Sequence, residues 1–181
     1  MLSGKKGSNT IGAVFRKVVL LFGTHFTNTA DFSSARFGSL TDFSFASFAK
    51  DANFVGAHFT KDVGFFRARF AEYANFRHAN FARDANFRSA HFANTAYFGY
   101  ARFANVANFS YAVLPDTLNF VYLQLDSLKA DIDFRESRLD STKNQKCIIL
   151  LRDRDISKLI LPVQSFTVGF ESSEKEGKKN S

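Results

Sequence analysis

Histidines and aspartates are the residues of this chain whose types could support catalysis or metal binding. The four histidines are His25, His58, His78 and His91. No two of them have the spacing of a metal site. His58 and His91 each lie between an Ala and a Phe, in a slot that other repeats fill with Arg or Asn, so we interpret them as solvated surface residues. Four aspartates could supply a carboxylate pair, but corner residues that bond the turn backbone are the interpretation we favour for Asp42, Asp51, Asp62 and Asp84.

Other catalytic signatures are missing from the sequence. Cys147 is the single cysteine, which excludes an internal disulfide framework and any multi-cysteine metal site. No glycine-rich phosphate loop and no Ser/His/Asp arrangement is found. The sequence therefore predicts no catalytic residue, no metal and no cofactor, and we expect the protein not to be an enzyme.

A set of arginines interleaved with aromatic residues is the feature most like a binding surface. Basic groups beside stacking rings suit single-stranded nucleic acid or an acidic partner. Glu72 and Asp84 lie among them, so a solvated face held by ion pairs between coils is the alternative interpretation. The residues of this candidate interaction surface are Phe66, Arg67, Arg69, Tyr73, Arg77, Arg88, Tyr97 and Tyr100.

An unbroken periodicity of phenylalanine determines how these residues are positioned. The chain has 24 Phe, and from position 32 onward their spacing alternates between five and six residues. The repeating unit is therefore eleven residues long, of the form Ala-x-Phe-x-x-Ala-x-Phe-x-x-x. The predicted core positions are Phe32, Phe37, Phe43, Phe48, Phe54, Phe59, Phe65, Phe70, Phe76, Phe81, Phe87, Phe92, Phe98, Phe103 and Phe109.

An eleven-residue period is also compatible with three helical turns, so the two secondary structures have to be compared. At about 100° per residue the apolar positions of the unit scatter around a helix and form no apolar stripe. An Ala-x-Phe pair instead places both side chains on one face of an extended segment. The pattern therefore predicts short strands, which must stack on copies of themselves because two or three residues cannot form a stable strand alone.

The steps of five residues, with Ala two positions before Phe and Asn between them, resemble the pentapeptide-repeat proteins. The tripeptide Ala-Asn-Phe occurs at 74–76, 85–87 and 107–109, and the resemblance covers about residues 13–139. It implies an all-β fold, a right-handed quadrilateral parallel β-helix with terminal caps. Four steps would close one coil of 22 residues, so Phe residues 22 apart should stack in columns. The sixth residues of alternate steps should lie at corners: Leu40, Asp51, Asp62, Tyr73, Asp84, Thr95, Val106 and Thr117.

The two ends of the array differ from its middle. Upstream, Ala13-x-Phe15, Val18-x-Leu20 and Thr24-x-Phe26 extend the pattern with one shifted spacing. We divide the chain into a basic, capping first segment with an irregular first coil (1–23), the repeat β-helix (24–139), a cap or dimerisation segment (140–170) and a disordered tail (171–181). Three apolar runs, at 147–151, 159–163 and 166–170, supply material for the cap.

A non-catalytic scaffold that binds a protein partner is the predicted function, with a homodimer through residues 140–170 as one form of partner. The alternative is binding of nucleic acid or an anionic membrane surface by the arginine faces and by Lys5, Lys6, Arg16 and Lys17. The resemblance also suggests inhibition of topoisomerases by DNA mimicry, but that role needs an acidic surface and the net charge is +7. We expect a cytoplasmic protein without a signal peptide or membrane span, with peripheral membrane association or secretion as an effector left open.

Overall fold

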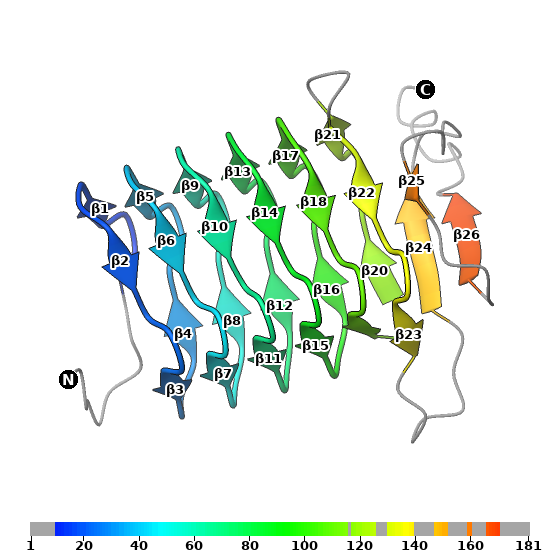
Figure 1. The fold of residues 1–181 in the computed structure, drawn as a ribbon, viewed down its shortest axis with the longest axis horizontal. Helices are drawn as coiled ribbons and strands as arrows, with labels where there is room; N and C mark the ends of the chain where they lie inside the picture. The colour runs from blue at the N-terminus through cyan, green and yellow to red at the C-terminus, as the bar shows by residue number, and fades with distance from the viewer. Residues whose placement is uncertain are drawn as a thin grey trace, which may run out of the picture.

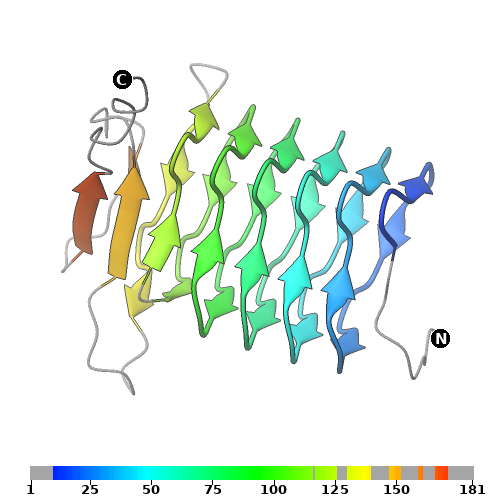
Figure 2. The same cartoon turned by 180° about the vertical axis from the view of Figure 1, so that it is seen from behind.

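The computed structural model describes residues 10–115, 117–125 and 130–139, together with the backbone of strands at 147–151, 159–160 and 166–170. These parts contain 26 short β-strands and no helix. The chain winds as a stack of coils from one end of the molecule to the other (Figure 1), and the view from behind shows the same stack without a break (Figure 2). No helix in the described parts is long and apolar enough to cross a membrane.

Four parallel sheets form the sides of the coil, and we name them faces I to IV in the order in which the chain crosses them. Face I contains β1 (Val14–Phe15), β5 (Arg36–Phe37), β9 (His58–Phe59), β13 (Asn80–Phe81), β17 (Arg102–Phe103) and β21 (Gln124–Leu125). Face II contains β2 (Val19–Leu20), β6 (Thr41–Asp42), β10 (Val63–Gly64), β14 (Ala85–Asn86), β18 (Ala107–Asn108), β22 (Ile132–Asp133) and β25 (Leu159–Ile160).

The other two sheets close the cross-section. Face III contains β3 (His25–Phe26), β7 (Ser47–Phe48), β11 (Arg69–Phe70), β15 (His91–Phe92), β19 (Val113–Leu114) and β23 (Arg138–Leu139). Face IV contains β4 (Ala30–Asp31), β8 (Ala52–Asn53), β12 (Ala74–Asn75), β16 (Ala96–Tyr97), β20 (Thr117–Asn119), β24 (Cys147–Leu151) and β26 (Phe166–Phe170).

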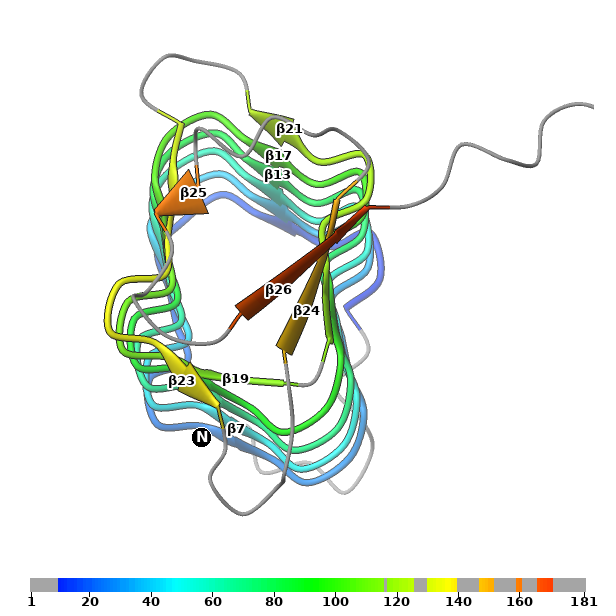
Figure 3. The ribbon, with the colours of Figure 1, turned by 90° about the vertical axis from the view of Figure 1, so that its right-hand side faces the viewer.

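The register between coils is 22 residues, as predicted. Ala74 pairs with Ala52 on one side and with Ala96 on the other. Seen from the C-terminal end, the chain runs counterclockwise from β17 through face II and β19 while it advances toward the viewer, so the coil is right-handed (Figure 3). The predicted fold, a right-handed four-sided parallel β-helix, is confirmed.

Phenylalanine rings fill the interior in columns that run along the axis. Phe76 stacks on Phe54 and on Phe98 with ring centroids 4.9 Å apart in both cases. This distance matches the spacing of about 4.8 Å between hydrogen-bonded strands, because each coil repeats the same ring. Rings of the face II column meet this column edge to face, as Phe65 and Phe87 do at 5.4 Å from Phe76. The predicted phenylalanine ladder is confirmed, and Phe15, Phe26 and Phe120 extend it at the ends.

The alternation of five and six residues produces two kinds of corner. Each five-residue step ends in a β-turn, in which Ala79 N–H donates to the Phe76 carbonyl at 3.0 Å and the third residue, His78, has a φ of 57°. Every positive φ among the described residues lies at such a turn. The six-residue steps use their extra residue to round the corner without a left-handed residue. The 22-residue coil therefore keeps four sides, with tight turns at two diagonal corners (IV/I and II/III) and wider bends at the other two.

Outward Asn and Asp side chains on faces II and IV hold the tight turns. Each accepts a hydrogen bond from the backbone N–H two residues later, at 2.8–3.3 Å, which is the bond of an Asx turn. The residues are Asp31, Asp42, Asn53, Asn75, Asn86, Asn108, Asn119 and Asp133. The expected bonding of turn backbone is thus found for Asp42, whereas Asp51 and Asp62 accept N–H groups of the following coil.

Two expectations about the ends need comment. The shifted spacing near the N-terminus is wrong: Val19 pairs with Thr41, and Leu21 packs against the core while Leu20 faces outward, so this coil follows the common register. Four consecutive apolar residues at 18–21 hid the phase. At the other end, β24 and β26 extend face IV and β25 extends face II, all parallel. The burial expected for Ile149, Leu151, Leu159, Leu161 and Phe166 lies outside the described side chains, and the cap stays a prediction.

Candidate functional site

A ridge of aromatic and arginine side chains runs along the tight corner between faces II and III. The ring of Phe45 lies 5.0 Å from Phe22 and 5.4 Å from Phe66. The guanidinium of Arg67 lies over both neighbours, 5.7 Å from the Phe45 ring and 5.2 Å from the Phe66 ring. Farther along, the guanidinium of Arg88 lies 5.0 Å from the ring of Tyr111. We name this set the II/III ridge: Phe22, Phe45, Phe66, Arg67, Arg88 and Tyr111.

A second row of rings lies at the diagonally opposite corner, between faces IV and I. His78 and Tyr100 stack at 4.8 Å, and Tyr100 and Tyr122 stack at 4.5 Å. These three residues occupy the same turn position in successive coils. We name them the IV/I row.

The backbone at these corners makes the choice of side chains informative. Glycine adopts a positive φ without strain, and Gly12, Gly23 and Gly56 occupy this turn position in three coils. The described chain nevertheless has nine other residues there, among them Phe45 and Tyr111 with φ of 58° and 59°. A bulky residue in this region is a conformational outlier that costs about 1–3 kcal/mol. Stacking between coils offsets part of this cost, and the side chains remain exposed to solvent.

The structure separates the residues of the predicted interaction surface. Phe66, Arg67 and Arg88 lie on the II/III ridge, whereas Arg77 and Tyr100 lie at the IV/I corner.

The remaining three lie elsewhere. Tyr97 is on face IV, with its ring 6.0 Å from that of Tyr73 at the III/IV corner. Arg69 is on face III, apart from both rows. Phe66 and Tyr97, expected to be exposed, are half-buried. The predicted set is thus two surfaces on opposite corners, and its role in binding stays a prediction.

Sequence reasoning missed four of the ring residues. Phe22, Phe45, Tyr111 and Tyr122 are outside the basic stretch from 66 to 100 that defined the predicted surface. The coil length of 22 residues is the signal that could have found them. Residues near 22, 44, 66, 88 and 110 share one corner, and residues near 78, 100 and 122 share the other.

Ion pairs between coils do not account for the arginines. Within the described ranges, no ion pair joins Glu72 or Asp84 to them, and the Glu72 carboxylate accepts a hydrogen bond from Asn94 at 3.0 Å. The pair that forms is local: Arg135 donates to Asp133 through Nε at 3.0 Å and Nη2 at 2.7 Å. The hydrogen bond from this guanidinium lowers the pKa of the buried Asp133 carboxyl.

A hollow of about 370 Å³ lies beside the IV/I row. Gly99 lies within it, where a side chain would approach the Val121 carbonyl at 3.3 Å. Arg77, Tyr97, Asn119 and Tyr122 are among its other lining residues. The hollow therefore combines one guanidinium with amide and phenol groups, a lining suited to hydrogen bonding with a polar partner.

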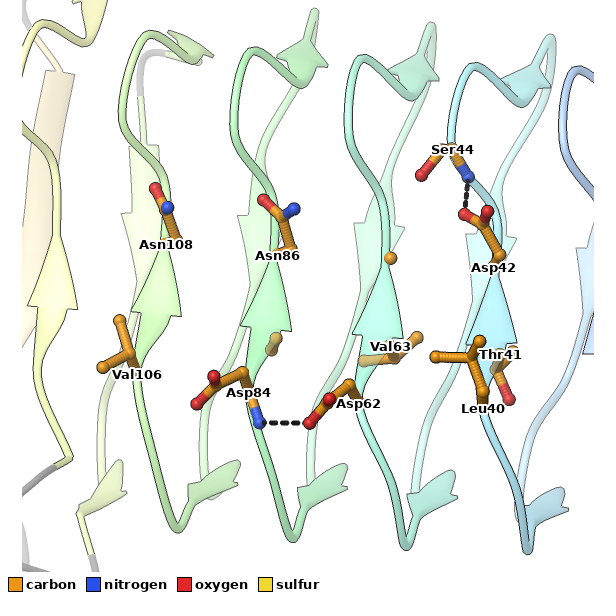
Figure 4. Close-up of a pocket in the computed structure, with 12 residues that line it drawn as sticks. Leu40, Thr41, Asp42, Ser44, Asp62, Val63, Asp84, Asn86, Val106 and Asn108 are labelled. Carbon is orange, nitrogen blue, oxygen red and sulfur yellow. Dashed lines mark hydrogen bonds between the residues drawn. The ribbon is translucent and has the colours of Figure 1, made fainter.

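A second hollow, of about 540 Å³, opens on face II (Figure 4). It exists because Gly64 interrupts the row of outward side chains. Its carboxylates serve the backbone: Asp42 accepts the Ser44 N–H at 2.8 Å, and Asp62 accepts the Asp84 N–H at 3.3 Å. Across the part of the chain that the structure describes, no three His, Cys, Asp or Glu side chains are grouped closely enough to hold a metal ion.

Comparison with known proteins agrees with this geometry. The sequence model of a family described as pentapeptide repeats (9 copies) matches residues 21–69 and 65–113. Together these two matches span just over half of the 181 residues. No match was found among curated proteins or among solved structures. The stacked Ala-x-Phe steps and the matched repeats make this chain a member of the pentapeptide-repeat family.

Proposed function

We propose that this protein is a non-catalytic interaction module that binds an acidic protein segment along the II/III ridge. The observation that carries the proposal is the display of Phe45, Arg67 and Tyr111 at left-handed turn positions where glycine would be free of strain. Residues that only had to complete a turn would not need rings or guanidinium groups. The cation–π contacts of Arg67 and Arg88 hold the guanidinium planes against rings, which leaves their N–H donors available for carboxylates.

The non-catalytic part of the proposal is supported by the lining of the hollows. On face II, Asp42 and Asp62 bond backbone N–H groups, so their oxygens are committed to the turns. At the IV/I corner, the Asn119 side chain accepts the Val121 N–H at 3.0 Å in the same way. Rigid, repetitive faces of this kind suit docking, since a solenoid presents the same groups at fixed intervals.

Serine substitutions on the ridge provide the test, because Ser34 and Ser89 already occupy the equivalent turn position in other coils. The intact chain and the double variant Phe45→Ser/Arg67→Ser are each used to capture binding partners. We expect the double variant to lose a stoichiometric partner that the parent retains. The matched control is Tyr73→Ser, an exposed ring away from the ridge. Equal retention of the same partner by both variants would refute the role of the ridge.

Nucleic acid is the second candidate partner, favoured by the guanidinium groups that lie over rings on this ridge. Salt separates the two candidates. Binding of a single-stranded oligonucleotide through phosphates weakens steeply between 50 and 200 mM salt, by about ten-fold or more when several phosphates are contacted. Tight, salt-sensitive oligonucleotide binding that Arg67→Ser and Arg88→Ser both weaken would replace the protein partner with nucleic acid.

A further inference from the structure

The outward slots of the first coil differ in chemistry from the same slots in every later coil. On face I the slot holds Val14 in the first coil, and Arg36, His58, Asn80 and Arg102 in the next four. Val14 is 58% exposed. The interior beneath it is already filled by Phe15 and the ladder, so Val14 contributes nothing to the core.

Face II repeats the difference. Its outward slot holds Leu20, which is 67% exposed, whereas Asp42, Gly64, Asn86 and Asn108 follow in the later coils.

The three corners beside these faces are apolar in the first coil as well, with Ile11, Val18 and Phe22 between 52% and 62% exposed. Faces III and IV of the same coil carry the polar residues His25 and Asp31. We name the apolar half of the first coil the collar: Ile11, Val14, Val18, Leu20 and Phe22.

The collar is accessible and basic. Strands β1, β2, β3 and β4 are the terminal strands of their sheets, so the coil lies at the end of the cylinder (Figure 1). Arg16 and Lys17 are exposed within the collar, between Val14 and Val18. Residues 1–23 carry four cations and no acid.

We propose that the collar docks the N-terminal end of the cylinder on an anionic membrane surface. Apolar side chains on one half of a rim, interleaved with cations, are the combination that binds the headgroup region of a bilayer, where apolar groups enter by about 5–10 Å and cations meet anionic lipid. Strand edges remain hydrated at that depth, so a shallow site imposes no burial of unpaired backbone. A second copy of the chain fits less well, because two collars in contact would place Arg16 and Lys17 of each copy together without an acidic counterpart.

Vesicle flotation with the full chain tests the proposal. The probes are vesicles of phosphatidylcholine alone and of phosphatidylcholine with 30% phosphatidylserine, a fraction chosen on the order of that in anionic cytoplasmic leaflets. The main variant is Val14→Asn/Leu20→Asn, because Asn80 and Asn86 occupy the same slots of faces I and II in a later coil. Val113→Asn is the control, an apolar outward residue on face III, away from the collar.

We expect the parent to bind the anionic vesicles, the Val14/Leu20 variant to bind them about ten-fold or more weakly with an unchanged melting temperature, and Val113→Asn to bind like the parent. Arg16→Gln/Lys17→Gln should remove most of the preference for anionic lipid, since each basic residue contributes about five-fold.

Three results would overturn the proposal. The first is a parent that stays unbound to both vesicles. The second is binding that the Val14/Leu20 variant retains in full, which would leave charge alone as the cause. The third is concentration-dependent oligomerisation of the parent without vesicles that this variant abolishes, which would make the collar an interface between copies.

Discussion

Removing one ring from the middle of the ladder tests how the core is held together, and Phe76→Ala is the sharpest such change. Phe76 is fully buried and touches six other rings. Two of them stack on its faces at 4.9 Å, and the other four lie at 5.4–6.2 Å. Each neighbour belongs to a column of its own and is fixed by the coils above and below.

The expected loss of unfolding free energy follows from this arrangement. A buried Phe→Ala change costs about 3–5 kcal/mol, and the cost rises when the surroundings cannot collapse into the cavity. Neighbouring coils are held about 4.8 Å apart by hydrogen bonds, so they cannot close the gap left by the ring. We therefore expect about 4–5 kcal/mol for Phe76→Ala. At the end of the ladder Phe15 is half-buried and stacks on Phe37 alone among the described rings, so Phe15→Ala should cost about 1–2 kcal/mol.

Guanidinium denaturation followed by far-ultraviolet circular dichroism measures both variants. At this chain length a loss of 4 kcal/mol corresponds to a fall in melting temperature of about 8–16 °C, which a thermal scan checks independently. The slope with denaturant should be unchanged, because the folded state buries the same backbone. Equal midpoints for Phe76→Ala and the parent, or equal losses for Phe76→Ala and Phe15→Ala, would refute a ladder whose rings depend on both neighbours.

Four other changes test the corners, the ion pair and the C-terminal strands. Asn108→Ala removes the acceptor of a turn N–H and should lower stability by about 1 kcal/mol, whereas Asn108→Asp keeps the acceptor and should cost less; equal denaturation midpoints would contradict the Asx turn. Gly56→Ala should cost about 1 kcal/mol because of its φ of 64°, although the nearest atom to the added Cβ would be 3.7 Å away, and a neutral result would show that the left-handed turn carries no strain. The lowered pKa of Asp133 means that its contribution to stability is present above the ordinary aspartate value of about 3.9 and is lost as pH falls through the lower folded value, so the melting temperatures of parent and Asp133→Asn should differ at pH 7 and converge near pH 2; a constant difference would refute the linkage. Ending the chain at Leu139 removes the strands that pair with β20 and β22 and should produce aggregation on size-exclusion chromatography, so a soluble, equally stable monomer would show that these strands are no cap.

Much of the fold follows from the sequence because one kind of residue must fill one kind of slot. A Phe every five or six residues allows few structures, since every ring has to be buried and an extended chain brings Ala and Phe to the same side. The coil of 22 residues, the columns and the strand character could therefore be predicted. The prediction failed at the start of the array, where Val18, Val19, Leu20 and Leu21 are all apolar, and only pairing with Thr41 and Asp42 showed which of them face inward.

The outward residues were decided by the tertiary structure. Nothing about a surface position restricts its residue type, so proximity in the sequence was a poor guide to which rings and cations meet. Phe45 and Phe66 are 21 residues apart in the chain and 5.4 Å apart in space, whereas Arg67 and Arg77 are close in the chain and lie on opposite corners.

The sequence by itself determined the period and the core, and the closing of the coil decided the surface. Burial selects side chains one by one, so its pattern is written directly into the order of residues. Contacts on the outside arise only when strands stack at about 4.8 Å and turns fix which residues share a corner. The II/III ridge and the collar exist for that reason, since each collects residues whose common position depends on the path of a whole coil.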